Sequence, residues 1–281
     1  MNQKSYDGKA CLYLIPTPIG NLDDITIRAL KTLEAVDFVL SEDTRETGKL
    51  LGKYEIKKKL VSCHEFNEDK IRSFVVDELK NGKNIGLVTD QGTPIISDPG
   101  YIVAKEVIRA GFNVVSLPGA TAFVPALTMA GIDPSPFMFY GFLNAKEDKR
   151  KKELQALKNF KYTFILYESP HRLKSTLMDM LEVLGDRNIS ISREISKIHE
   201  EVLRDKISNL IDCADSLKGE FVLVVEGNKE VIDYSDMNIV DHVKLYVEDG
   251  LSEKEAIKLV AKERNVAKSI IYKEYHDSKE N

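Results

Sequence analysis

Charged residues that could do chemistry follow several of the short apolar runs in this sequence. The candidates are Asp43, Arg45, Glu168, Arg193 and Glu194. Carboxylates can accept protons, and arginines can bind oxyanions through two parallel hydrogen bonds. Functional residues concentrate in loops at the carboxyl ends of strands, where a rigid sheet positions them. This arrangement therefore predicts the cleft of an enzyme.

The turn "IPTPIGN" at residues 15–21 follows the first apolar run and precedes a predicted helix. Nucleotide-binding folds place glycines in such a turn so that backbone amides can approach phosphate. Here Pro16 and Pro18 lack amide donors, and Gly20 is the one glycine. We therefore expect a ligand without pyrophosphate.

The sequence lacks the patterns of several common enzyme classes. It has no GxGxxG after a strand, no GxxxxGK[ST] and no GxSxG, which argues against dinucleotide, P-loop and serine acyl-transfer sites. Its His, Cys and Asp residues lack zinc-ligand spacing, so we expect no metal.

The elements that must position these residues alternate between strand and helix. β-Branched apolar runs predict strands at residues 11–16, 36–41, 84–89, 113–117, 137–142, 162–167, 189–192 and 221–226. Helical patterns lie at residues 26–35, 45–52, 67–81, 99–110, 121–130, 147–158, 170–184 and 205–214. The predicted class is α/β, with two α/β domains that carry mostly parallel sheets.

Helix starts and one sharp break organise the chain. Asp43 has capping-box spacing to Glu46, and Asp98-Pro99 and Ser169-Pro170 each place a capping residue before a proline. The break at residues 117–119 predicts a domain boundary. The expected domains are 1–118 and 119–230, both α/β, followed by a helical tail at 231–281 of two or three helices, with a capping box at Ser252 and Glu255.

The composition of the chain indicates the cellular compartment in which the protein acts. The chain has 281 residues, 43% hydrophobic content and a formal net charge of −5. No apolar run approaches the roughly 18–20 residues of a membrane span, and the amino terminus lacks a signal-peptide core. Three scattered cysteines indicate a reducing compartment, so we expect a cytoplasmic protein without membrane contact. RNA contact would need local basic patches, such as residues 146–161 or 57–59, although taken alone these are more typical of solvated helix or turn surface.

Several longer segments carry a family resemblance. They are "LYLIPTPIGNLDDITIRAL", "SEDTRETGKLL", "LVTDQGTPIISDPGY", "LPGATAFVPALTMAG", "FYGFL", "YESPHRL" and "SREISKIHEE". Over residues 10–228 the chain resembles the bacterial ribosomal RNA small-subunit methyltransferase I family of the tetrapyrrole methylase superfamily. The tail resembles the helix-turn-helix extension of that branch. Gln91, Glu46 and Asn144 depart from the commoner alanine, histidine and proline.

The resemblance implies a cofactor and a substrate. The cofactor is S-adenosylmethionine, folded in the cleft between the two α/β domains. The substrate is a ribose 2′-hydroxyl of a decoding-region cytidine in 16S rRNA of the small ribosomal subunit, and the superfamily is homodimeric. The cofactor positions carried over are Ile19, Asp90, Gly92, Thr93, Ile95, Thr121 and Ala122, with Tyr167 and Leu223 near the adenine.

The resemblance also implies roles for the charged residues. Proton acceptors for the hydroxyl could be Asp43, Glu168, His171, Glu194 or Lys197, and phosphate contacts could come from Arg45, Arg172 or Arg193. Structural alternatives stand beside each role. Asp43 could only cap a helix, Arg193 and Glu194 could form an ion pair, and His171 and Arg172 could be plain surface. The identity of the base stays open.

Two other functions compete with this interpretation. A tetrapyrrole methyltransferase would share the fold, but "PTPIGN" is not the glycine-rich first turn typical of that branch. A non-catalytic RNA-binding module for ribosome assembly would be favoured by an eroded cofactor turn. The intact Gly92-Thr93-Pro94 and Pro118-Gly119 argue against it.

Overall fold

The computed structural model describes residues 3–5, 7–64, 66–229, 237–248 and 250–278. Its contacts divide the chain into two compact units, residues 1–228 and residues 229–281. Each unit is described by itself. The predicted boundary between residues 230 and 231 lies outside the described residues, and the three-part division remains a prediction.

The first sheet is fully parallel. Its strands are β1 (Cys11–Leu14), β2 (Phe38–Ser41), β3 (Lys59–Ser62), β4 (Ile85–Val88) and β5 (Asn113–Ser116). They lie in the order β3-β2-β4-β1-β5, and every neighbouring pair runs in the same direction. The order reverses around β4 and β1, so the loops after these strands open at a switch point where ligands bind in such sheets.

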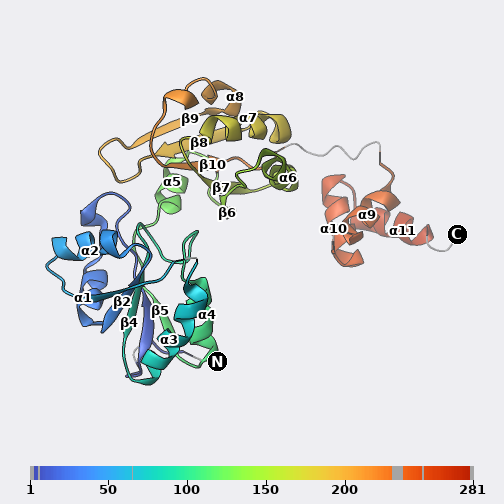
Figure 1. The fold of residues 1–281 in the computed structure, drawn as a ribbon. Coiled ribbons are helices and arrows are strands. Elements are labelled where there is room, and N and C mark those ends of the chain that lie inside the picture. The colour runs from blue at the N-terminus through green and yellow to red at the C-terminus, as the bar shows by residue number, and fades with distance from the viewer. Residues whose placement is uncertain (1–2, 6, 65, 230–236, 249, 279–281) are drawn as a thin grey trace. The chain divides into compact units, whose positions relative to one another are not determined.

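Helices cover both faces of this sheet (Figure 1). The short 3-10 helix η1 (Leu22–Asp24), α1 (Ile27–Ala35) and α2 (Thr44–Lys53) come early in the chain. Apolar residues of α1 and α2 pack with one face, and those of α3 (Glu68–Lys80) and α4 (Tyr101–Arg109) pack with the other. The three-layer arrangement buries the strands on both sides, which explains their near-continuous apolar runs.

The second sheet is largely antiparallel, which corrects the prediction of mostly parallel pairing here. Its strands are β6 (Phe137–Phe142), β7 (Thr163–Glu168), β8 (Asn188–Arg193), β9 (Glu201–Lys206) and β10 (Phe221–Val225), in the order β6-β7-β10-β8-β9. Of the neighbouring pairs, only β6 and β7 are parallel. The short loop between β8 and β9 forms a hairpin, and a hairpin forces antiparallel pairing.

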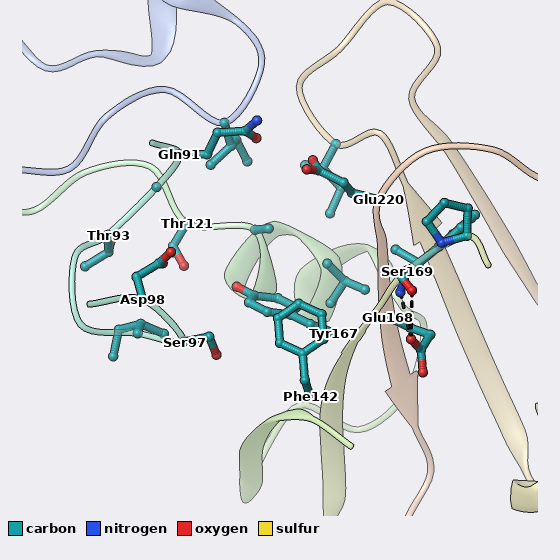
Figure 2. Close-up of a pocket in the computed structure, with 18 residues that line it drawn as sticks. Gln91, Thr93, Ser97, Asp98, Thr121, Phe142, Tyr167, Glu168, Ser169 and Glu220 are labelled. Carbon is teal, nitrogen blue, oxygen red and sulfur yellow. Dashed lines mark hydrogen bonds between the residues drawn. The ribbon is translucent and has the colours of Figure 1, made fainter. Parts of the chain in front are cut away.

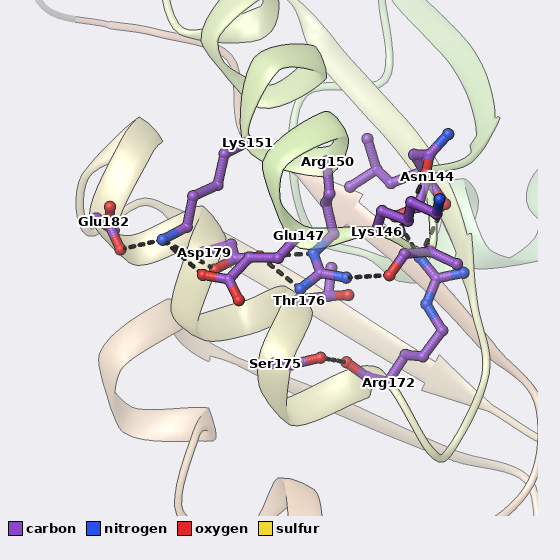
Figure 3. Close-up of polar contacts among 12 residues, drawn as sticks. Asn144, Lys146, Glu147, Arg150, Lys151, Arg172, Ser175, Thr176, Asp179 and Glu182 are labelled. Carbon is purple, nitrogen blue, oxygen red and sulfur yellow. Dashed lines mark hydrogen bonds and ion pairs between the residues drawn. The ribbon is translucent and has the colours of Figure 1, made fainter.

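Helices also cover this second sheet. On one face, α5 (Phe123–Met129) packs against residues of β7 and β10. On the other face lie α6 (Glu147–Leu157), α7 (Leu173–Leu184), α8 (Ile207–Leu210) and the short η2 (Ala214–Ser216). A buried ion pair joins α6 to α7, because Arg150 lies 2.6 Å from Asp179 Oδ2 (Figure 3). The α/β class predicted from the sequence is confirmed.

Two predicted helix starts differ from the structure. Pro99 does not open a helix: α4 begins at Tyr101, and its N-cap is Gly100 rather than Asp98. Glu68 supplies the missing cap, because its carboxylate accepts hydrogen bonds from the amides of Gly100 and Ile102. Likewise α7 begins at Leu173, after a turn at residues 170–172. The Asp43 cap is confirmed, with Oδ1 accepting from the Arg45 amide at 2.8 Å.

The tail unit consists of α9 (Ile239–Glu248), α10 (Glu253–Glu263) and α11 (Lys268–Asp277). Its own core contains Val243, Ile257, Val260 and Ile271. The predicted capping box is present, with Ser252 and Glu255 each satisfying a backbone amide of the other residue. The expectation of two or three tail helices is therefore confirmed within the described residues.

Candidate active site

Three turns of the chain meet at the carboxyl ends of β1, β4 and β5. Thr17 and Gly92 exchange two backbone hydrogen bonds, of 2.9 and 3.0 Å. The Thr17 hydroxyl donates to the Thr89 carbonyl at 3.1 Å, and the Thr93 hydroxyl donates to the Ala120 carbonyl at 3.0 Å. These bonds hold the turns after the three strands against one another.

Two glycines make this close approach possible. Gly92 has φ +82°, and a Cβ there would lie 3.3 Å from Ile19 Cγ2 and 3.7 Å from the Ala120 oxygen. A Cβ on Gly119 would lie 2.5 Å from Pro16 Cβ, closer than real Cβ contacts allow. Pro16 of the "IPTPIGN" turn therefore packs directly on the backbone of the third turn. Pro16 therefore serves packing between turns, and Pro16 and Pro18 offer no amide to a phosphate.

A cavity of about 340 Å³ opens beside these turns (Figure 2). Its walls come from both sheets of the first unit. The lining residues are Ile19, Gln91, Gly92, Thr93, Ile96, Ser97, Asp98, Thr121, Ala122, Phe142, Tyr167, Glu168, Ser169, Pro170, Ile195, Glu220, Phe221 and Val222. This lining contains carboxylates and no lysine or arginine, so the cavity favours a ligand without phosphate and tolerates a cation.

Most of the predicted cofactor positions lie on this cavity. Those that line it are Ile19, Gly92, Thr93, Thr121, Ala122 and Tyr167. Leu223 is fully buried in the core on the opposite face of its sheet, while its neighbour Val222 lines the cavity. Alternation along a strand explains this difference, since successive side chains point to opposite faces.

Asp90 and Ile95 belong to the loop after β4 but do not line the cavity themselves. The Asp90 carboxylate accepts a hydrogen bond from the Asp43 amide at 3.1 Å, which connects this loop to the start of α2. Ile95 has φ +79°, a conformation that β-branched residues rarely adopt. Strained backbone of this kind concentrates at ligand sites, where the surrounding structure holds it in place.

Glu168 lines the cavity, but its carboxylate is held by neighbouring residues. It accepts hydrogen bonds from the Ser169 amide at 2.8 Å and the Thr176 hydroxyl at 2.6 Å. Arg172 Nε lies 3.5 Å from it, while Arg172 Nη2 donates to the carbonyls of Leu143 and Asn144 (Figure 3). Arg172 is thus engaged within the fold, whereas His171 is exposed in the preceding turn.

Asp43 and Arg45 form a close pair outside the cavity lining. Arg45 donates from Nε to Oδ1 at 3.1 Å and from Nη2 to Oδ2 at 2.6 Å. The Arg45 side-chain hydrogen bond and the Arg45 amide lower the pKa of Asp43 below its ordinary value. A carboxylate with a lowered pKa is a weak proton acceptor, so the pair suits ligand positioning better than base catalysis.

Arg193, Glu194 and Lys197 flank the hairpin between β8 and β9. Arg193 Nε lies 2.8 Å from Glu201 Oε2, its partner across the hairpin. Lys197 lies 3.0 Å from Glu194 and 2.8 Å from Glu220. Partial burial acts to raise the pKa of Glu194, but the Glu220 amide and the Lys197 ammonium outweigh it and lower the pKa overall.

The same loop contacts the first turn. The Lys197 side chain packs on Gly20, and the Ser196 hydroxyl is hydrogen-bonded to Asp24. These contacts connect the second sheet to the turn after β1, beside the cavity. The predicted residues of this loop are therefore engaged in ion pairs within the first unit.

Asp98 was not among the residues predicted from the sequence to be functional. The sequence "SDPG" predicted a helix cap there, yet the structure places Asp98 in the cavity wall. Burial, together with the nearby carboxylates of Glu42 and Asp90, raises the pKa of Asp98 to about 6 against the opposing effect of the Thr89 hydroxyl. Its position in the loop after β4 was a usable signal, but nine residues separate Asp98 from the end of the strand.

The first unit is an α/β fold of two sheets with a cavity lined from both, and comparison with known proteins gives its family. The sequence model described as "Tetrapyrrole (Corrin/Porphyrin) Methylases" matches residues 11–211. The chain therefore belongs to the tetrapyrrole methylase family, in the branch of the ribosomal RNA small subunit methyltransferase I proteins. The resemblance identified in the sequence is confirmed.

Two relatives carry that branch assignment. Ribosomal RNA small subunit methyltransferase I of Bacillus subtilis (strain 168) is 49% identical over 98% of this chain and 98% of its own length. The protein of the same name from Halalkalibacterium halodurans is 45% identical over 98% of each chain. Both matches extend through the tail unit.

Solved structures support the fold. Cobalt precorrin-4 methyltransferase, a cobalamin biosynthetic enzyme, matches with a TM-score of 0.57 and 19% identity over 80% of this chain and 98% of its own. Uroporphyrin-III C-methyl transferase from Thermus thermophilus, complexed with S-adenosylhomocysteine, matches with a TM-score of 0.55 and 15% identity over 77% of this chain and 97% of its own. At this identity the likeness concerns the fold alone.

No group of three or more His, Cys, Asp or Glu residues is arranged to hold a metal ion in the part of the chain that the structure describes. Among those same residues, no helix has the length and apolar character needed to cross a bilayer.

Proposed function

We propose that this protein transfers a methyl group from S-adenosylmethionine to the ribose 2′-hydroxyl of a decoding-region cytidine in 16S rRNA. The observation that carries the proposal is the near-full-length identity of 49% to a named ribosomal RNA small subunit methyltransferase I. The cavity at the switch point adds a site of suitable chemistry. A tetrapyrrole substrate has no comparable support, because those structures resemble the chain in fold only.

The residues around the cavity fit S-adenosylmethionine. A volume of about 340 Å³ is within the range of small-molecule sites. Gly92 lets the backbone approach the ligand, and Phe142, Tyr167 and Val222 offer apolar surface for an adenine. The carboxylate-bearing wall suits a ligand that carries a sulfonium and an ammonium. When bound, the cofactor supplies a methyl group already activated by its sulfonium.

The work of the chain is then mainly alignment. The turns after β1, β4 and β5 are cross-linked by hydrogen bonds, so the cavity wall is preorganised to hold the reactants in line. Loss of the hydroxyl proton must accompany transfer, because a ribose hydroxyl is a weak nucleophile at neutral pH. Asp43 and Arg45 lie near the loop after β4 and are proposed to contact the RNA.

The proposal includes the setting of the reaction. The substrate is the RNA of the small ribosomal subunit, so the protein acts in the cytoplasm. The family resemblance supports a homodimer, for which light scattering would give twice the 31.7 kDa of the chain. A mass of one chain at micromolar concentration would exclude that state.

Methyl transfer from labelled S-adenosylmethionine tests the activity. The acceptors are small ribosomal subunits from a strain that lacks this enzyme, the matching wild-type subunits, and a reduced tetrapyrrole. We expect label in the RNA of the first acceptor alone. Label in the tetrapyrrole would contradict the proposal and identify a tetrapyrrole methyltransferase. No label in any acceptor would favour a non-catalytic binding role.

A further inference from the structure

Asp98 occupies a distinctive place in the cavity wall. It lies on the loop after β4, between Ser97 and the start of α4, and its carboxylate is directed toward Thr121 in Figure 2. Burial raises the pKa of Tyr167, the Thr121 side chain acts to lower it, and the charge of Asp98 acts to raise it. Asp98 therefore lies beside the polar side chain of Thr121 in a cavity that apolar residues also line.

The architecture of α4 leaves this carboxylate available. An aspartate followed by proline would ordinarily cap the helix that follows. Here the amides of Gly100 and Ile102 donate to the buried carboxylate of Glu68 on α3 instead. The nearby Thr89 hydroxyl acts to lower the pKa of Asp98, but it donates its hydrogen bond to Glu42 Oε2 at 3.0 Å. A single hydroxyl proton cannot satisfy both carboxylates.

The other carboxylates of the cavity wall are engaged elsewhere. Glu168 accepts from Ser169 and Thr176, and Figure 2 shows its side chain turned toward Ser169. Glu220 lies 2.8 Å from the Lys197 ammonium and is largely exposed. Among the acidic residues that line the cavity, Asp98 alone has neither a cation nor a backbone amide bound to it in the described structure.

We propose that Asp98 is the proton acceptor for the substrate hydroxyl during methyl transfer. This inference rests on the proposed function. In the reaction the hydroxyl oxygen forms a bond to the methyl carbon as the carbon–sulfur bond breaks. The bond electrons go to sulfur, which becomes a neutral thioether, and the hydroxyl proton goes to a carboxylate oxygen of Asp98.

The surroundings of Asp98 suit that role. Burial and the charges of Glu42, after β2, and Asp90, after β4, raise its pKa to about 6. The base is therefore ionised at neutral pH, yet holds a proton more tightly than an ordinary carboxylate does. General bases work best when their pKa lies near the operating pH.

The test compares Asp98→Asn with Asp77→Asn, which removes an exposed aspartate of α3 far from the cavity lining. Rates of a single turnover are measured on small subunits at saturating S-adenosylmethionine over a range of pH. We expect wild type and Asp77→Asn to lose activity below about pH 6. We expect Asp98→Asn to be slower by about 10²- to 10⁴-fold, without that pH dependence.

Calorimetric binding of S-adenosylhomocysteine separates base catalysis from cofactor binding. The Asp98→Asn protein should bind within about twofold of wild type, a difference well below the 1.4 kcal/mol of a tenfold change. Wild-type rates in the Asp98→Asn protein would overturn the proposal. Lost cofactor affinity with a normal rate at saturation would also overturn it and make Asp98 a cofactor ligand. An inactive wild-type protein would instead contradict the proposed function.

Thermal unfolding gives a readout independent of activity. Because the folded-state pKa of Asp98 lies above the ordinary aspartate value of 3.8, folding becomes less favourable as pH rises from 3.8 to about 6. The penalty is complete at higher pH and nearly absent around pH 4. Asp98→Asn should therefore raise Tm relative to wild type near pH 8 and change it little near pH 4. If Asp98→Asn and wild type had the same Tm at pH 8 as well as at pH 4, the raised pKa of the Asp98 carboxyl would be contradicted.

Discussion

At the residue scale, the cavity depends on positions where one extra carbon cannot be placed. Gly92 sits where the turns after β1, β4 and β5 converge, with Ile19 and Ala120 as its nearest neighbours. Its positive φ and its surroundings both disfavour a side chain. The same reasoning applies to Gly119, whose backbone is covered by Pro16.

Substitution Gly92→Leu should abolish measurable binding of S-adenosylmethionine. The new side chain would enter the space between Ile19 and Ala120 and displace the turns that form the cavity wall. The matched control is Gly82→Leu, because Gly82 has φ +81° and no heavy atom within 4 Å of an added Cβ. Both variants carry a backbone strain of about 1–2 kcal/mol, so only the crowding differs. Calorimetry that finds normal affinity in folded Gly92→Leu would refute the cofactor placement.

Arg45→Ala should lower methyl transfer to the small subunit roughly tenfold or more, since a hydrogen bond to a charged group contributes about 1.5–3 kcal/mol. Cofactor affinity should stay unchanged, because Arg45 does not line the cavity. Lys53→Ala, which removes a positive charge at the other end of α2, is the control. Asp43→Asn tests the pair without losing the helix cap, since asparagine caps as well as aspartate. Weaker cofactor binding, with an unchanged rate at saturating cofactor, would show that Asp43 and Arg45 contact the cofactor and not the RNA.

At the element scale, α4 and the loop before it are held by a residue from another helix. Glu68 of α3 binds the first amides of α4, which fixes the loop that carries Thr93 and Asp98. Charge-assisted bonds to backbone amides are among the stronger hydrogen bonds in proteins. The helix start and one wall of the cavity therefore depend on α3.

Glu68→Ala should lower the free energy of unfolding by about 1–3 kcal/mol, because it leaves buried amides without a partner. Glu106→Ala, on α4 itself and paired with Arg109, should change it by less than about 1 kcal/mol. Urea unfolding measures both. Equal effects of the two substitutions would show that the cap does not hold this loop.

Elements with a strong apolar pattern were predictable from the sequence, and β3 and β9 were not. The β9 segment "EVLRDK" is charged because it lies at the edge of its sheet, where charge discourages further pairing. Strand direction in the second sheet was also mispredicted. The apolar runs of β8 and β10 resemble buried parallel strands, but direction depends on the hairpin loop at residues 194–200.

Part of the candidate site was predictable from the turns that follow predicted strands. The family resemblance gave Gly92, Thr93, Thr121 and Ala122 in two of these turns a cofactor role, and all four line one cavity. Asp98 was missed because a carboxylate before proline indicates a helix cap, and the competing cap comes from Glu68, distant in sequence. Tertiary contacts of this kind leave no local signal.

At the scale of the whole molecule, we propose that the tail unit offers a separate surface for RNA. Exposed lysines lie along α10 and α11: Lys254, Lys258, Lys262, Lys268 and Lys273. Arg264 does not add to this surface in the same way, because its Nε donates to His242 Nδ1 at 3.0 Å within the unit. The nearby acidic residues Glu253, Glu255 and Glu274 reduce the net charge, so a stabilising role competes with RNA binding.

Removal of residues 229–281 should leave cofactor affinity intact, because the cavity belongs entirely to the first unit. Binding to the small subunit should weaken, and its dependence on salt should flatten, because each lost phosphate contact removes about one unit of slope. Replacement of Lys258 and Lys262 by Gln in the full chain controls for loss of fold. An unchanged salt slope in both proteins would contradict RNA contact and favour the structural role.

The most direct test of the central claim identifies the methylated nucleoside. Small subunits lacking the modification are methylated in vitro with the purified protein, and their 16S rRNA is digested and analysed by mass spectrometry. The 2′-O-methyl group protects the adjacent phosphodiester from alkali, which separates ribose from base methylation. We predict a 2′-O-methylcytidine in an alkali-resistant dinucleotide from the decoding region. A base-methylated nucleoside, or RNA without added methyl groups, would contradict the account.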